Sequence, residues 1–194
     1  MPIEITIRQV ATDDDRGRVR AFFQAHIDDP TAFEIPARQT DRELGIPSRI
    51  RVAEDSSGNL VGAVFASNNP EDVIRWRMQG NDQVADVIAA EMFMIHELAV
   101  HPQAQRQGIG RRLVEAAFDD ARGASTSVTA LLYDHRTPGL TEFYRALGFQ
   151  TLGPRQRLEL NFTALPGITV GFPQERPEFA WALRTLNPAR VTRL

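Results

Sequence analysis

The sequence predicts an α/β fold, in which short strands and amphipathic helices alternate along the chain. Three observations predict it. The apolar residues of segment 3–7 alternate with polar ones, as in a half-buried strand. Two β-rich runs, 50–53 and 60–67, are separated by a turn-rich segment and predict a hairpin. In residues 91–122, a compact apolar run, a loop with two glycines and an apolar stripe at helical spacing follow one another, which indicates strand, loop and helix.

The first helix is expected to begin after Thr12. A hydroxyl can cap a helix, and the three aspartates at 13–15 suit the positive end of the helix dipole. The helix is expected to run through Ile27 and to stop before Pro30, since a residue that precedes proline disfavours the helical conformation. A short second helix is predicted over 38–44.

The middle of the chain is expected to contain a long excursion and then a buried strand. Residues 71–90 have a helical pattern that is broken at Gly80, and we interpret them as a cover over one edge of the site or as a solvated insertion. The apolar run that follows has the length of a buried strand. Pro102 ends it, because proline has no N–H to give to a sheet ladder. The helical stripe after the loop consists of Leu113, Val114, Ala117, Phe118 and Ala121.

The last third of the chain is expected to complete the sheet. Its predicted elements are a strand at 128–133, a helix at 140–147, a strand that opens at Phe149 and a last strand at 157–162. These elements complete a predicted domain of residues 1–162. The extension 163–194 is predicted to pack on that domain or on a second subunit, because its aromatic residues are of the kind enriched at interfaces. If the extension packs on a second subunit, the protein is a homodimer.

The composition is that of an ordinary globular protein, and it argues against several classes of protein. The chain has 194 residues, 42% hydrophobic and 24% charged. A formal net charge of −3 disfavours nucleic acid as a partner. The absence of cysteine excludes disulfides, thiolate metal sites and a cysteine nucleophile. We also expect no metal at His101 or His135, which lack spaced carboxylate partners. No apolar run approaches ~20 residues and no signal peptide is evident, so we expect no membrane association and a cytoplasmic location.

The loop after the central strand, residues 105–110, has the features of an anion site. Glycines permit the turn and the close approach of a phosphate to the N–H groups of the following helix. A P-loop would need Lys-Ser/Thr where Arg111 begins, and a dinucleotide fingerprint would need a third glycine at Leu113. What remains is Gln105-Arg106-Gln107-Gly108-Ile109-Gly110. The alternative is a plain turn whose glycines serve tight packing.

Preceded by residues 98–102, Leu-Ala-Val-His-Pro, this loop resembles the pyrophosphate-binding motif of the GNAT superfamily of N-acetyltransferases. A second stretch, 143–149, reads Phe-Tyr-Arg-Ala-Leu-Gly-Phe and resembles the family's other signature. The resemblance implies a mixed, mostly antiparallel twisted sheet flanked by helices, with parallel central strands that splay apart. It also implies acetyl-coenzyme A as the acyl donor.

The cofactor-binding residues that the resemblance implies form two groups. The backbone of Leu98, Ala99 and Val100 would hold the pantetheine arm. The pyrophosphate would lie on the loop and the first helical turn, at Gln105, Arg106, Gln107, Gly108, Ile109, Gly110 and Arg111. Many family members carry an asparagine seven residues before the motif tyrosine, where it contacts coenzyme A. Thr137 takes that place here, and its hydroxyl can still form a hydrogen bond.

Acetyl transfer to an amine needs a base, an oxyanion donor and an acid for the leaving thiolate. The resemblance places Tyr144 near the sulfur, as a cofactor contact and general acid; the alternative is a tyrosine that fills the core. Glu97 and His96 are base candidates on the central strand, where consecutive residues face opposite sides. Glu91, at the start of that strand, is a weaker candidate, and each of the three could instead have a structural role. A backbone N–H near Leu98 is the expected oxyanion donor.

The expected acceptor is a small amine or an amino-acid-like molecule. In the family the region between the first two helices helps to form the acceptor pocket, and here it contains His26, Asp28, Asp29 and Glu34. Acidic groups there would favour a cationic amine, and an ordinary solvated loop is the alternative. Two other functions stay open: acetylation of a protein N-terminus or lysine, and a regulatory module that binds coenzyme A without useful catalysis.

Overall fold

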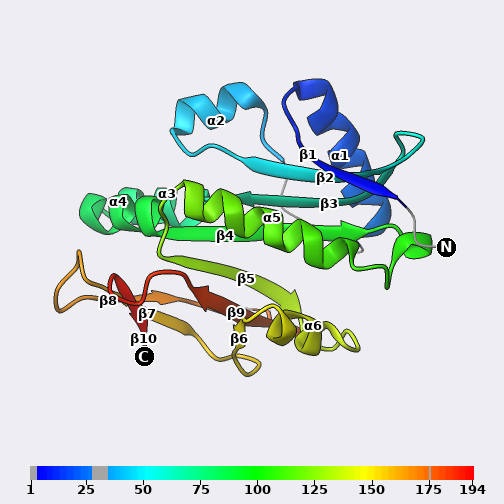
Figure 1. Cartoon of the computed structure of the whole chain (residues 1–194). Helices are drawn as coiled ribbons and strands as arrows, with labels where there is room; N and C mark the ends of the chain where they lie inside the picture. Colours follow the sequence, from blue (N-terminus) through cyan, green and yellow to red (C-terminus); the bar gives the residue numbers. More distant parts are fainter. Residues whose placement is uncertain (1–3, 28–34, 175) are drawn as a thin grey trace. The chain divides into compact units, whose positions relative to one another are not determined.

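The computed structural model describes residues 4–27, 35–174 and 176–194 (Figure 1). The chain divides into two compact units. The first unit takes in residues up to Ser67 together with Ile95–Asp120. The second takes in Asn68–Met94 and everything from Ala121 onward. Strand β4 (Met92–Val100) and helix α5 (Ile109–Gly123) contribute residues to both units.

The first unit is built on an antiparallel sheet. Its strands are β1 (Ile5–Gln9), β2 (Arg49–Asp55) and β3 (Leu60–Ser67), in the order β1-β2-β3 with the end of β4 beside β3. The predicted hairpin is confirmed, since β2 and β3 pair antiparallel, with a register shift at Ala53/Glu54. The chain leaves β4 at His101, whose N–H donates to the carbonyl of Val61 at 2.9 Å.

Both predicted helices of the first unit are confirmed. Helix α1 spans Asp13–His26 and α2 spans Arg38–Leu44. The Thr12 hydroxyl caps α1 by accepting a hydrogen bond from the Asp15 N–H at 3.1 Å. The apolar side of α1 enters a buried cluster with the sheet, formed by Val10, Val19, Phe22, Phe23, Ile35, Ile50, Val52, Ala63, Phe65 and Ala99.

Helix α5 approaches β3 closely at Gly62. A Cβ at this glycine would lie 3.0 Å from Leu113 Cδ1 and 3.1 Å from Ile109 Cγ2. A Cβ would therefore force the side chains of Leu113 and Ile109 to shift by a few tenths of an ångström, and glycine lets the first turns of α5 lie this near to the strand without that shift. Near its other end, α5 is tied to β2, where Arg51 Nε donates to Asp120 Oδ2 at 2.9 Å. These contacts fix the direction in which the α5 N-terminus points.

The second unit has a sheet in the order β4-β5-β9-β6. Its strands besides β4 are β5 (Val128–Asp134), β9 (Phe179–Thr185) and β6 (Gln150–Thr151). Strands β4 and β5 are parallel, but their register holds only from Met92↔Val128 to Met94↔Ala130, although both strands continue. The other pairs are antiparallel. The predicted mixed, mostly antiparallel sheet is confirmed, and the short parallel register agrees with central strands that splay.

A three-stranded sheet and three helices complete the second unit. The sheet has the order β10-β7-β8, from Val191–Arg193, Leu158–Phe162 and Thr169–Phe172. Helices α3 (Pro70–Met78) and α4 (Asp82–Glu91) lie side by side (Figure 1), and α6 spans Leu140–Ala146. The predicted break at Gly80 separates α3 from α4, and this glycine has a φ of +74°.

The expectation that 157–162 is the last strand is wrong. Strands β8, β9 and β10 follow it, and β9 pairs with β5 from Val128↔Thr185 to Asp134↔Phe179. Four consecutive residues of β9 are buried, so the strand shows no alternating pattern that marks it in the sequence. Phe172 and Trp181, which suggested a second subunit, pack against each other with ring centroids 6.2 Å apart. The homodimer and the division at residue 162 stay predictions.

The sequence predicts that Glu91 opens the central strand. In the structure it is instead the last residue of α4. Only 3% of it is exposed. Its carboxylate accepts a hydrogen bond from the Ser127 hydroxyl and forms an ion pair with Arg190, close to the C-terminal strand β10. Glu91 therefore connects the end of α4 to the C-terminal segment within the second unit, and its suggested role as a base is not supported by these contacts.

Replacement Arg190→Leu is expected to lower the free energy of unfolding by about 2–3 kcal/mol. Removing one partner of a fully buried pair costs roughly 3–5 kcal/mol, and the expected loss is smaller because 48% of the Arg190 side chain is exposed. Urea titration measures the effect. The double variant Glu91→Gln/Arg190→Leu should recover part of the loss, because it no longer leaves a buried charge without its partner. An unchanged urea midpoint for Arg190→Leu would contradict this role.

Candidate functional site

The glycine loop of the first unit joins β4 to α5 in an ordered path. A 3₁₀ turn, Pro102–Ala104, follows the strand. The Gln105 side-chain amide then donates to the carbonyl of Val100 at 3.2 Å, which ties the loop back to the end of β4. Arg106 and Gly108 both have positive φ, +62° and +78°. These two left-handed residues turn the chain sharply enough for α5 to begin at Ile109.

The start of α5 presents hydrogen-bond donors without acceptors. Among the residues that the structure describes, the N–H groups of Gly110 and Arg111 have no backbone partner, as expected in a first helical turn. A Cβ at Gly108 would meet nothing within 4 Å, so the space beside this glycine is open. Free N–H groups, the positive end of a helix dipole and an open approach together suit a phosphate. The loop therefore fits the pyrophosphate that the sequence predicts for it.

The predicted cofactor residues differ in how much of their side chain or backbone is open to a ligand. The Ile109 side chain is 2% exposed and packs at Gly62, so only its backbone can face a ligand. Gln105 uses its side chain to hold Val100, and Gln107 reaches the Gln103 carbonyl at 3.5 Å. Arg111 is half exposed and 3.9 Å from Glu115, which leaves its guanidinium at the surface of the helix start. Leu98, Ala99 and Val100 lie on the last part of β4, directly before the loop.

His96 and Glu97 differ in their surroundings. The His96 ring stacks on Phe65 with centroids 4.9 Å apart, and its Nε2 shares a hydrogen bond with the Ser67 hydroxyl at 2.7 Å. Burial lowers the pKa of His96 from 6.5 to about 3. The imidazole is therefore neutral near pH 7 and too weakly basic to remove a proton from an ammonium group. Glu97 is half-buried on the same strand, and its assignment as the base stays a prediction.

The lowered pKa of His96 predicts acid sensitivity. Below pH 6.5 the unfolded chain binds a proton at this residue, whereas the folded chain does not until about pH 3. The free energy of unfolding should therefore fall as the pH is lowered through this window. In His96→Gln, which keeps a polar group for Ser67, the fall should be shallower. Urea titrations at several pH values measure how the free energy of unfolding depends on pH in the wild type and in His96→Gln. The same dependence in both proteins would show that His96 does not cause the acid sensitivity.

Two histidines of the first unit meet beside the glycine loop. His26, at the end of α1, stacks on Phe22 with centroids 4.3 Å apart. Its ring also lies 5.1 Å from that of His101, which follows β4. The sequence does not indicate this pair, because 75 positions separate its members and only the packing of α1 brings them together. The other predicted acceptor residues, Asp28, Asp29 and Glu34, lie outside the described residues.

Tyr144 and Thr137 belong to the second unit. Tyr144 is 5% exposed on α6, and its ring lies 5.1–5.6 Å from those of Tyr133, Phe143 and Phe149. Thr137 is exposed in the turn between β5 and α6, where its N–H donates to the Asp134 carbonyl at 3.1 Å. An aromatic surrounding agrees with either role considered for Tyr144, so its catalytic assignment, like the cofactor contact of Thr137, stays a prediction.

The described residues contain no group of three or more His, Asp or Glu side chains placed to hold a metal ion. None of their helices combines the length and the apolar character that crossing a membrane requires.

Comparison with known proteins identifies the family. The sequence model of the acetyltransferase (GNAT) domain matches residues 47–151, more than half of the chain. The chain belongs to the GNAT family. The matched GNAT segment begins before β2 and ends with β6, and it contains both stretches that resemble the family's signatures.

Relatives of this GNAT chain include one curated enzyme and several solved structures. The N-alpha-acetyltransferase RimI of Mycobacterium tuberculosis is 31% identical over 122 residues, which are 63% of this chain and 65% of that protein, so the match spans just under two thirds of the relative. A putative acetyltransferase of Salmonella typhimurium, yncA, solved with acetyl-CoA, has a TM-score of 0.60 at 17% identity over 94% of both chains. The ribosomal-protein-S18-alanine N-acetyltransferase of Escherichia coli has a TM-score of 0.58 at 14% identity over 95% of both chains. At these identities the two structures support the fold.

Proposed function

We propose that the chain is an acetyl-coenzyme A-dependent N-acetyltransferase that acts on a primary amine. The observation that carries the proposal is the loop 105–110, with its two left-handed residues and its free N–H groups at the start of α5. Family membership supports the same donor, because the loop lies inside the matched GNAT segment and resembles the family's pyrophosphate-binding motif. The Salmonella structure contains acetyl-CoA, which agrees with this choice.

The proposed reaction is a direct transfer within a ternary complex. Acetyl-coenzyme A supplies the thioester; the amine nitrogen forms a bond to its carbonyl carbon, and the carbon–sulfur bond breaks. Glu97 receives the amine proton, directly or through a water, and Tyr144 gives a proton to the departing sulfur. A backbone N–H near Leu98 would stabilise the oxyanion. No acyl-enzyme is needed, in agreement with a chain without cysteine.

The acceptor that we favour is a small amine or an amino-acid-like molecule. The name of the Mycobacterium relative supports a second candidate, the α-amino group of a protein N-terminus. Both candidates present an α-amine or a similar primary amine, and they differ in whether a chain of residues must follow it. A peptide acceptor needs room for its second and third residues, which a small amine does not.

A thiol-release assay with acetyl-coenzyme A and three sets of acceptors tests the proposal. The sets are free amino acids and small amines, short peptides with a free N-terminus, and the same peptides with a blocked N-terminus and one lysine. Turnover with the first set supports the favoured acceptor, and turnover confined to the second supports N-terminal acetylation. Acetyl-coenzyme A binding without turnover in any set would favour a regulatory coenzyme A-binding module instead.

A further inference from the structure

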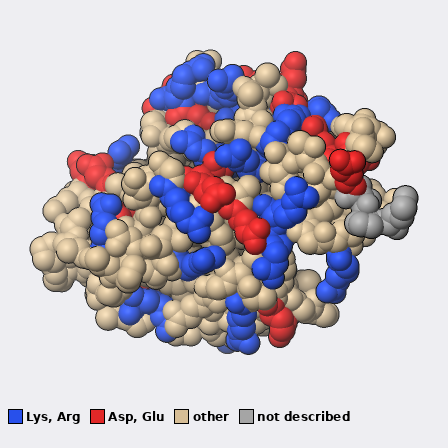
Figure 2. Space-filling model, viewed as in Figure 1, with Lys and Arg blue, Asp and Glu red and all other residues tan. Residues whose placement is uncertain are grey.

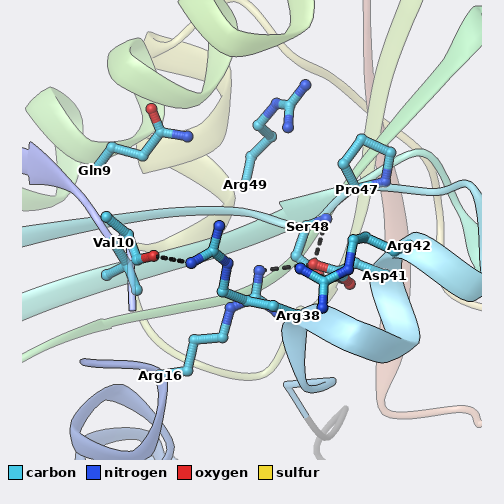
Figure 3. A pocket seen from close by; sticks show the side chains of 10 residues that line it. Gln9, Val10, Arg16, Arg38, Asp41, Arg42, Pro47, Ser48 and Arg49 are labelled. Atoms are coloured by element: carbon cyan, nitrogen blue, oxygen red, sulfur yellow. Dashed lines mark hydrogen bonds and ion pairs between the residues drawn. The ribbon is translucent and has the colours of Figure 1, made fainter. Parts of the chain in front are cut away.

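A pocket in the first unit gathers arginines from three separate elements. It has a volume of about 420 Å³, within the range of roughly 300–1,000 Å³ that small-molecule sites occupy. Its wall is formed by the end of β1, helices α1 and α2, and the start of β2. The lining residues with charged side chains are Arg16, Arg38, Arg42, Arg49 and Asp41 (Figure 3).

The single carboxylate of the pocket is already neutralised. Asp41 is 7% exposed, and its Oδ2 pairs with Arg16 Nη2 at 2.6 Å. The Ser48 hydroxyl and N–H also donate to this carboxylate, at 2.7 and 3.1 Å. Figure 3 shows these partners converging on Asp41. Four arginines against one aspartate leave the pocket a formal charge of +3, in a chain whose net charge is −3.

Two of the remaining guanidinium groups have no partner in the part of the chain that the structure describes. Among the described residues, neither Arg42 nor Arg49 has an ion pair or a side-chain hydrogen bond, and Figure 3 draws none to either. The Arg38 guanidinium donates to the carbonyl of Ala11 at 2.7 Å, a neutral acceptor, and forms no ion pair with a described residue. Figure 2, in which every blue residue is an arginine because the chain has no lysine, shows such side chains gathered over α2. Like charges so placed repel, and an anion between them would relieve the repulsion.

A buried donor at the same wall also lacks an acceptor. Arg16 is 7% exposed; its two terminal nitrogens bind Asp41 and the Pro36 carbonyl, but its Nε has no partner within the described part of the chain. Buried N–H groups are usually satisfied, so an unsatisfied one calls for a ligand or water that supplies the acceptor.

We propose that this pocket binds a small anion that carries at least two negative charges, on either a phosphate group or several carboxylate groups. Guanidinium groups match both, because their planar forks donate paired hydrogen bonds to two oxygens of one group. A concave site of this volume suits a small molecule rather than a polymer. The inference concerns binding and is independent of the proposed acetyl transfer.

The pocket is distinct from the glycine loop. Arg49 pairs with Ala66 near the end of β3, whereas His101, which leads into the glycine loop, bonds to Val61 near its start. Five residues along a strand correspond to about 16 Å. A ligand in the arginine pocket therefore occupies the other end of β3 from the cofactor loop.

Calorimetric titration of the full chain with inorganic phosphate and with citrate, in 150 mM NaCl, tests the proposal. The double variant Arg42→Gln/Arg49→Gln should bind the preferred anion at least tenfold more weakly. Its stability without ligand should not fall, because within the described residues these arginines have no partner to lose, and the substitutions relieve the repulsion between like charges. The matched control Arg77→Gln/Arg193→Gln removes the same charge from the second unit and should bind as the wild type does.

The variant Gly108→Val separates this site from the cofactor loop, because it should retain the anion affinity of the wild type. Binding of phosphate alone assigns a phosphate site, and binding of citrate alone assigns a carboxylate site. The proposal is overturned if the wild type binds neither anion, or if both double variants bind the preferred anion equally well.

Discussion

Replacement Gly108→Val is expected to weaken the binding of acetyl-coenzyme A about 10- to 100-fold. Gly108 has a φ of +78° in open space, and a β-branched residue is a rare outlier in that conformation. The new side chain would also stand where the phosphate approaches. One lost hydrogen bond to a charged group is worth about 1.5–3 kcal/mol, which corresponds to this change in affinity. Calorimetric titration with acetyl-coenzyme A measures it.

Gly58→Val is the matched control for backbone strain. Gly58 has a φ of +79°, open space around its Cβ position and a place in the β2–β3 hairpin of the same unit. Both variants should lose about 1–3 kcal/mol of stability, and only the Gly108 variant should lose cofactor affinity. Gly110→Val adds a second test, because Gly110 lies in α5 and is not in a left-handed conformation. Unchanged affinity in both loop variants, with folding confirmed, would remove the loop from the cofactor site.

Replacement Tyr144→Phe is expected to lower kcat by up to about 100-fold. General acid catalysis typically contributes ~10²–10⁴-fold, and a coenzyme A thiolate already leaves well near neutral pH, so the low end applies. The substitution removes one oxygen and almost no volume from a side chain that is 5% exposed. Stability should therefore fall by no more than about 1–2 kcal/mol, the cost of one hydrogen bond. The change should appear in kcat, since an acid acts in the transition state.

Tyr133→Phe is the matched control for packing. Tyr133 is 4% exposed, its ring lies 5.3 Å from that of Tyr144, and its hydroxyl shares a hydrogen bond with Thr141 at 3.2 Å. The same atom is removed from the same aromatic cluster, so a loss of kcat in Tyr144→Phe alone points to chemistry. Wild-type turnover by Tyr144→Phe, with the chemical step shown to be rate-limiting, would make Tyr144 a packing residue.

The sequence by itself determined the features that depend on short stretches of chain. Thr12 caps α1 because an N-cap needs only its own side chain and an N–H three residues on. The break at Gly80 and the glycine loop at 105–110 depend on local backbone freedom, and the stripe of α5 depends on helical periodicity. The order of these elements was enough to indicate the family and, with it, the donor and the residues proposed to bind it.

Only the tertiary structure decided features that join distant segments. Strand β9 pairs with β5 from more than 40 residues away, and burial on both faces removed its sequence pattern. Glu91, predicted as a strand residue and weak base candidate, meets Arg190 across 99 positions. Burial of His96, whose ring stacks on Phe65, lowers the pKa expected of a strand histidine. The arginine pocket combines residues 16, 38, 42 and 49 from separate elements. Each depends on which surfaces pack together, and no local pattern contains that information.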